Sequence, residues 1–104
     1  MLVCTTWKAR PLSREQANRM MTIWGKIEAA TADNPASERL CWYITSDGSG
    51  GMLVSKFVDV EAAAASELEA AIALGEFLEF ESKIVLDLET AMPAILKAME
   101  HVNS

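Results

Sequence analysis

Residues 40–58 read LCWYITSDGSGGMLVSKFV, and their pattern distinguishes between the possible fold classes. Its two ends, residues 40–45 and 52–58, are short runs of apolar, aromatic and β-branched residues, which are typical of strands. The segment SDGSGG between them consists of turn-forming residues. The stretch therefore predicts a β-hairpin in the middle of the chain, with a loop longer than a tight two-residue turn. No GKS or GKT follows Gly51, so this glycine-rich loop lacks the phosphate-binding motif.

Two further strands lie at some distance on either side of the hairpin. In residues 1–9, Val3, Thr5 and Trp7 alternate with a second set of side chains, and β-branched and aromatic residues favour a strand. Residues 78–89, LEFESKIVLDLE, alternate along almost their whole length, which is the clearest period-two pattern in the chain. The sequence thus predicts four strands.

A first helix is predicted between the first strand and the hairpin. Ser13 stands three residues before Gln16, the spacing of a capping box. Apolar residues then recur every three or four positions until residues 32–36, ADNPA, end the helix. Because glycine inside a helix costs about 1 kcal/mol relative to alanine, Gly25 suggests close packing against the sheet. Trp24 lies at the centre of the apolar stripe and is expected to contact the sheet.

Two more helices follow. Asp59 is placed to cap a helix of mostly small residues that ends near Gly75, and small residues let a helix lie close to a sheet. Thr90 is placed to cap a last helix with Pro93 in its first turn. Its apolar face comprises Met92, Ile95, Leu96, Met99 and Val102.

The order strand, helix, strand, strand, helix, strand, helix predicts the α+β class. Right-handed crossovers place both long helices on one face of a four-stranded antiparallel sheet, which is the ferredoxin-like βαββαβ fold with a C-terminal helix. A doubly wound α/β fold is the alternative, but the central hairpin and the small number of βα units disfavour it. We expect residues 1–104 to form a single domain.

The two faces of the predicted sheet differ in their cover. On each strand, the more apolar of the two alternating sets of side chains is predicted to face the helices. This set comprises Val3, Thr5, Trp7, Leu40, Trp42, Ile44, Leu53 and Phe57. The opposite, open face then carries Leu2, Cys4, Thr6, Lys8, Cys41, Tyr43, Thr45, Met52, Val54, Lys56 and Val58. So many apolar groups in water are unusual for a monomer. We therefore expect a homodimer through the open sheet face, with two sheets packed against each other.

Composition excludes several classes of function. The net charge of -6, from 15 acidic and 9 basic residues, disfavours nucleic-acid binding. No apolar run is long enough to span a membrane, and the N-terminus lacks a signal-peptide pattern, so we expect a cytoplasmic protein. Cys4 and Cys41 lie in strand-like runs and are expected to stay reduced, and the single histidine is His101. We expect no metal and no cofactor.

Short motifs along most of the chain resemble the dimeric α+β barrel superfamily. They are Trp7, Pro11, Gly50-Gly51, Phe80-Glu81, Val85-Leu86-Asp87, Glu89 and Ala91. More narrowly, the chain resembles a family of short bacterial domains of unknown function. The superfamily includes cofactor-free monooxygenases, haem-degrading enzymes, small isomerases and stress-responsive binding domains. The haem-binding branch depends on a histidine in or beside the second helix, and residues 61–74 contain none. The monooxygenase branch implies a pocket of polar and aromatic groups, for which Trp7, Trp42 and Tyr43 are the nearest candidates.

Two functions follow as hypotheses. The first is a non-catalytic homodimer that binds a small apolar or aromatic ligand or a protein partner, since no acid, base or nucleophile has a distinctive spacing. The alternative is a small cofactor-independent enzyme, monooxygenase-like or isomerase-like, which rests on the resemblance alone. For either function, Thr6, Tyr43 and Lys56 are the candidate ligand-binding groups, because all three lie on the open face.

Overall fold

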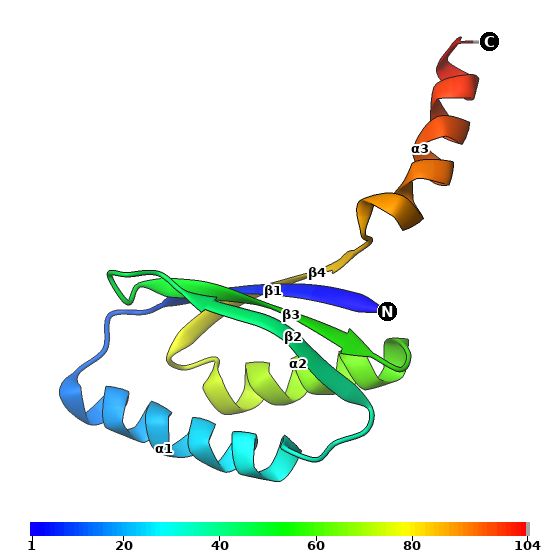
Figure 1. The fold of residues 1–104 in the computed structure, drawn as a ribbon. Helices are drawn as coiled ribbons and strands as arrows, with labels where there is room; N and C mark the ends of the chain where they lie inside the picture. Colours follow the sequence, from blue (N-terminus) through cyan, green and yellow to red (C-terminus); the bar gives the residue numbers. More distant parts are fainter. Residues whose placement is uncertain (104) are drawn as a thin grey trace.

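The computed structural model describes residues 1–103 and has a four-stranded antiparallel sheet with strand order β2-β3-β1-β4. The strands are β1 (Leu2–Ala9), β2 (Ser37–Ile44), β3 (Gly50–Phe57) and β4 (Leu78–Val85). The helices are α1 (Arg14–Thr31), α2 (Val60–Leu74) and α3 (Leu88–Asn103). Figure 1 shows this βαββαβ arrangement with its C-terminal helix, which confirms the predicted ferredoxin-like fold.

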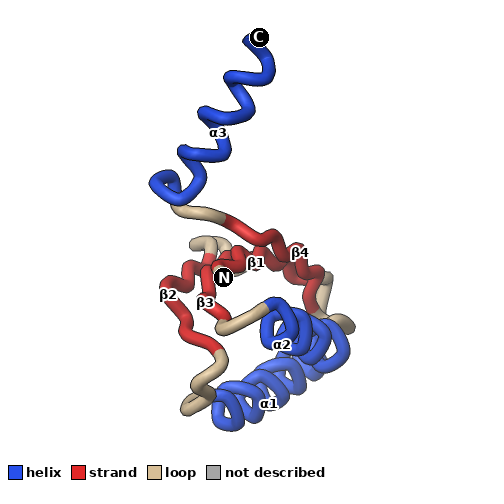
Figure 2. The backbone as a smooth tube through the Cα atoms, turned by 90° about the vertical axis from the view of Figure 1, so that its right-hand side faces the viewer, coloured by secondary structure: helices blue, strands red, loops and turns tan. Residues whose placement is uncertain are grey.

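The helices lie on different sides of the sheet. Helices α1 and α2 cover one face, and α3 extends from the end of β4 on the opposite side (Figures 1 and 2). This arm gives the chain an extent of 60 Å along its longest axis against 30 and 21 Å along the others. Within residues 1–103, no helix is both long enough and apolar enough to cross a membrane.

The helix-covered face carries an aromatic contact between α1 and the sheet. The ring of Trp24 on α1 meets that of Trp42 on β2 edge to face, with their centroids 4.8 Å apart. Val3 on β1 is also on the helix-covered face and is buried. The predicted position of Trp24 and the helix-facing assignment of Trp42 and Val3 are therefore confirmed.

Two details of the predicted packing are wrong. Leu40 does not face the helices, because the β2–β3 register shifts between Arg39 and Cys41 and leaves Leu40 half exposed in a bulge. Gly25 does not approach the sheet: it is exposed, and a Cβ atom built on it would meet nothing within 4 Å.

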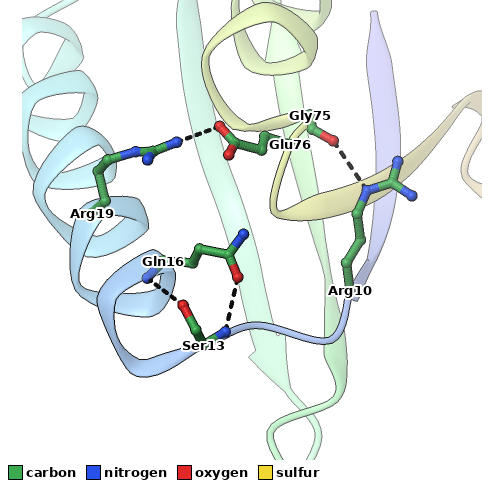
Figure 3. A network of polar contacts seen from close by, with 6 residues as sticks. All are labelled: Arg10, Ser13, Gln16, Arg19, Gly75 and Glu76. Carbon is green, nitrogen blue, oxygen red and sulfur yellow. Dashed lines mark hydrogen bonds and ion pairs between the residues drawn. The ribbon is translucent and has the colours of Figure 1, made fainter.

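Phe77, just before β4, is the most buried large side chain, with 1% of its surface exposed. The guanidinium of Arg19 on α1 lies over its ring, 5.3 Å from the centroid, and forms an ion pair with Glu76. Figure 3 shows this pair beside the Arg10 Nε–H that donates to the Gly75 carbonyl at 3.1 Å. These contacts join the start of α1 to the end of α2.

Helix α1 begins with the predicted capping box. The backbone N–H of Gln16 donates to Ser13 Oγ at 3.1 Å. In return, the backbone N–H of Ser13 donates to the side-chain oxygen Oε1 of Gln16 at 2.9 Å (Figure 3). Each group satisfies a donor that the first helical turn leaves free.

The last helix begins earlier than predicted. Asp87, not Thr90, caps α3: its carboxylate accepts a hydrogen bond from the Thr90 amide at 2.7 Å. Strand β4 accordingly ends at Val85, and Pro93 lies inside α3 beyond its first turn. The alternating pattern of residues 86–89 hid this boundary, because an aspartate cap and a polar strand position look alike in sequence.

We expect Trp24→Ala to lower the free energy of unfolding by about 3 kcal/mol, because it removes the aromatic contact between α1 and the sheet. A urea titration followed by circular dichroism measures this change. Met21→Ala, at an exposed position of the same helix, is the control and should cost less than about 0.5 kcal/mol. Equal losses in the two variants would contradict the packing described for Trp24.

Candidate functional site

A hollow of about 700 Å³ lies at the end of the sheet where β1 ends, the β2–β3 hairpin turns and β4 begins. Ligand pockets in proteins range from roughly 300 to 1,000 Å³, so the hollow is large enough for a molecule of several rings. The lining combines aromatic, apolar and charged groups: Thr6, Trp7, Lys8, Tyr43, Ile44, Thr45, Ser49, Gly50, Gly51, Met52, Glu79, Phe80 and Glu81.

Two glycines of β3 lie close to Trp7, one against its ring and one against its backbone. Trp7 pairs with Gly51 on one side and Phe80 on the other. A Cβ atom on Gly51 would overlap the Trp7 ring, and one on Gly50 would overlap the Trp7 carbonyl. Sequence reasoning noted this pair of glycines only as a motif and missed its role, although glycines in a strand signal close approach of another group.

The hairpin loop is held by Asp47. Its Oδ1 accepts hydrogen bonds from the Ser49 amide at 3.0 Å, the Thr45 hydroxyl at 2.7 Å and the Ser49 hydroxyl at 2.8 Å. These donors hold the pKa of Asp47 at about 2, the Ser49 amide being the largest cause. Gly48 supplies the turn with a φ of 75°. Because the loop's own carboxylate uses these donors, they are not available to a phosphate.

The structure brings together two of the three predicted ligand-binding residues. Thr6 and Tyr43 both line the hollow and flank Met52 in the register of the sheet. Tyr43 is 65% exposed, and the Thr6 hydroxyl donates to the Glu81 carbonyl at 3.4 Å. Lys56 pairs with Leu2 at the other end of the sheet and does not line this hollow.

An aromatic cluster continues from the hollow to α1. The rings of Trp7 and Trp42 are 6.2 Å apart, and the Arg39 guanidinium lies 4.5 Å from the centre of the Trp42 ring. Glu28 accepts hydrogen bonds from Trp24 Nε1 at 3.2 Å and from Arg39. Trp42 Nε1 is buried without a hydrogen-bond partner among the described residues, which costs about 1–3 kcal/mol. Ring contacts, not a hydrogen bond, therefore position Trp42.

Charged groups at the hollow form ion pairs near the surface. Glu79 pairs with Arg10 at 3.0 Å and Glu81 with Lys83 at 3.3 Å. Lys8 is paired in register with Glu79 and lines the same hollow. Side chains of Glu79 and Glu81 are 60% and 68% exposed, so water screens both pairs. In the part of the chain that the structure describes, no three His, Cys, Asp or Glu side chains gather as a metal site.

Solved structures with the same fold include several oxygenase-like proteins. A Nitrosomonas europaea protein, provisionally described as an antibiotic biosynthesis monooxygenase, is 12% identical with a TM-score of 0.58, covering 85% of this chain and 99% of its own. A mutant of SnoaB, a cofactor-independent oxygenase from Streptomyces nogalater, is 13% identical with a TM-score of 0.57, covering 83% and 91%. A dimeric ferredoxin-like protein of unknown function from Jannaschia is 13% identical with a TM-score of 0.57, covering 82% and 100%. These likenesses confirm the ferredoxin-like fold.

Comparison by sequence gives one curated relative, prenyltransferase nscD from Arthroderma gypseum. It is 29% identical over 105 residues, which cover 98% of this chain. The chain spans 22% of that protein's length. No family model matches the chain.

The low pKa of Asp47 predicts a pH dependence of stability. Because the pKa falls from its ordinary 3.8 to about 2 on folding, the charged carboxylate stabilises the fold above pH 3.8, and this contribution is lost as the pH falls toward 2. Asp47→Asn should therefore be less stable than the wild type at neutral pH, and the difference should shrink across that range. Denaturant titrations at several pH values measure it. Thr45→Val, which removes one donor, should give a smaller effect in the same direction, and a constant difference would contradict the prediction.

Proposed function

We propose that this chain is a homodimeric, cofactor-independent oxygenase that binds an electron-rich aromatic substrate in the hairpin-end hollow. The observation that carries the proposal is the lining of the hollow. It combines the aromatic residues Trp7, Tyr43 and Phe80 with the charged residues Lys8 and Glu79 around a volume suited to a multi-ring ligand. The fold shared with a cofactor-independent oxygenase supports the same class.

The reaction sets requirements that the hollow is able to meet. Without a metal or flavin, dioxygen must take its electrons from the substrate. A methylene activated by neighbouring rings reacts with one O₂ to give a carbonyl and one water, which balances without another reductant. The substrate must first lose a proton, so a nearby cation that stabilises the resulting anion favours the reaction. We assign this role to the Lys8 ammonium, with Thr6 and Tyr43 as hydrogen-bonding groups for substrate oxygens.

A binding-only role is the second candidate. It is favoured by the exposed, ion-paired state of Glu79 and Glu81, because each carboxylate is engaged with a cation and screened by water instead of being aimed at a bound ligand. In this candidate the hollow binds an aromatic molecule through Trp7 and Phe80 without changing it. Lys56 stays a predicted ligand group for a different position on the open face.

Oxygen uptake with anthrone, a three-ring ketone with an acidic methylene, separates the two candidates. We expect uptake above the protein-free rate, with one carbonyl formed per O₂, and a loss of about tenfold or more in Lys8→Ala. Lys26→Ala, on the exposed side of α1, is the matched control and should match the wild type. Quenching of tryptophan fluorescence that Trp7→Phe abolishes, without oxygen uptake, would favour binding only. Neither quenching nor uptake would contradict both candidates for this class of ligand.

The homodimer rests on the open face of the sheet. Cys4, Val54 and Cys41 form a row across three strands on this face, with Met52 and Tyr43 exposed beside it. Two such faces packed about a two-fold axis would cover both rows. Both cysteines are free, and because β3 lies between their strands they are too far apart to form a disulfide with each other.

We expect the wild type to be a dimer of twice 11.4 kDa at micromolar concentration and Val54→Asp to be a monomer. The substitution places an unpaired charge in the dry centre of the contact. Light scattering coupled to size exclusion measures both masses, and circular dichroism checks that the variant is folded. Ala29→Asp, on the exposed side of α1, is the control and should stay dimeric. A monomeric wild type, or a folded Val54→Asp dimer, would contradict the interface.

A further inference from the structure

Helix α3 exposes an apolar stripe along its whole length. The exposed fractions of the stripe residues run from 38% to 82%. They are Leu88, Met92, Ile95, Leu96, Met99 and Val102, which recur every three or four positions and therefore share one face. A helix of 16 residues is marginally stable alone in water, so α3 depends on packing of this stripe.

The placement of α3 restricts what can cover the stripe. Helix α3 follows β4 after two residues and lies on the open side of the sheet, away from α1 and α2 (Figures 1 and 2). The exposed residues Tyr43 and Met52 and the apolar row around Val54 are on this same side. One partner placed here would cover both surfaces.

The length of α3 shows where it would lie relative to that partner. At about 1.5 Å per residue the helix is roughly 24 Å long. Two packed sheets lie only about 10 Å apart, so the helix is long enough to reach past the gap between them to the partner. Because α3 leaves the edge strand β4, it would pass beside the partner's sheet instead of entering between the two sheets.

We infer that α3 is an exchanged arm: in the dimer, the α3 stripe of each copy packs against the other copy. This inference rests on the homodimer proposed above. A second copy is the occupant that the observations favour, because every chain carries both exposed surfaces on one side and a two-fold axis satisfies them together. Packing on its own sheet would need α3 to fold back at residues 86–87, whereas in the structure it extends away from that sheet (Figure 1).

The test is a cross-link that distinguishes the two chains. Met99 is replaced by the photoreactive amino acid benzoylphenylalanine in the full-length chain, and ¹⁴N-labelled and ¹⁵N-labelled protein are mixed and re-equilibrated before irradiation. We expect mass spectrometry to find cross-linked peptides in which one peptide comes from a ¹⁴N-labelled chain and the other from a ¹⁵N-labelled chain. Links confined to single chains, or no links in a sample that is dimeric by light scattering, would overturn the exchange and leave the homodimer standing.

A matched pair of variants gives an independent readout. Ile95→Asp places a charge in the stripe, whereas Ala94→Asp places the same charge on the opposite face of α3. We expect Ile95→Asp to raise the dimer dissociation constant at least about tenfold and Ala94→Asp to leave it unchanged. Equal dissociation constants would overturn the inference. A wild type that is monomeric throughout would instead show that the homodimer itself is wrong.

Discussion

The helices cover one face of this antiparallel sheet, and the organisation of the whole chain follows from the other face being left open and partly apolar. The strand order β2-β3-β1-β4 puts α1 and α2 together, so the open face keeps Cys4, Val54 and Cys41 in one uncovered row. The proposed dimer, the hollow at one end of the sheet and the arm at the other are separate consequences of this one-sided arrangement. A partner on the open face would also change how far the hollow is open to water.

Beside the hollow, Trp7 fits closely against two glycines of β3. Because Gly51 has no Cβ, the Trp7 ring lies against β3, and Trp7 both lines the hollow and belongs to the cluster with Trp42. A rigid indole wall suits stacking with a flat ligand. The carboxylates nearby are exposed and paired, so charge stabilisation by Lys8 is a stronger basis for chemistry here than proton abstraction by a protein base.

The sequence predicted most of the fold because local signals agreed with the topology. The hairpin of residues 40–58, the Ser13 cap and the contact of Trp24 with the sheet all follow from short-range patterns. Leu40 and the start of α3 did not, because a bulge depends on pairing between strands and an aspartate cap looks like a polar strand position in sequence. For the site, the shared face of Thr6 and Tyr43 was readable, but the hollow also depends on the pairing of β1 with β4, which brings Glu79, Phe80 and Glu81 beside the hairpin. Lys56 shares that face, yet distance along the strand separates it from the hollow.

Folding and association are expected to be coupled in this chain. Among the described residues, the buried hydrophobic side chains are Val3, Ala63, Leu74 and Phe77, a small core for 104 residues. Much of the apolar surface that would stabilise the chain is instead on the open face and on α3, where only another molecule is able to bury it. If both surfaces are covered in a dimer, the apolar area lost from water adds to stability at a rate of about 25 cal/mol per Å², and that gain depends on protein concentration. The β4–α3 junction would then be less ordered in the monomer than in the dimer, because in the monomer no partner chain holds α3 in place.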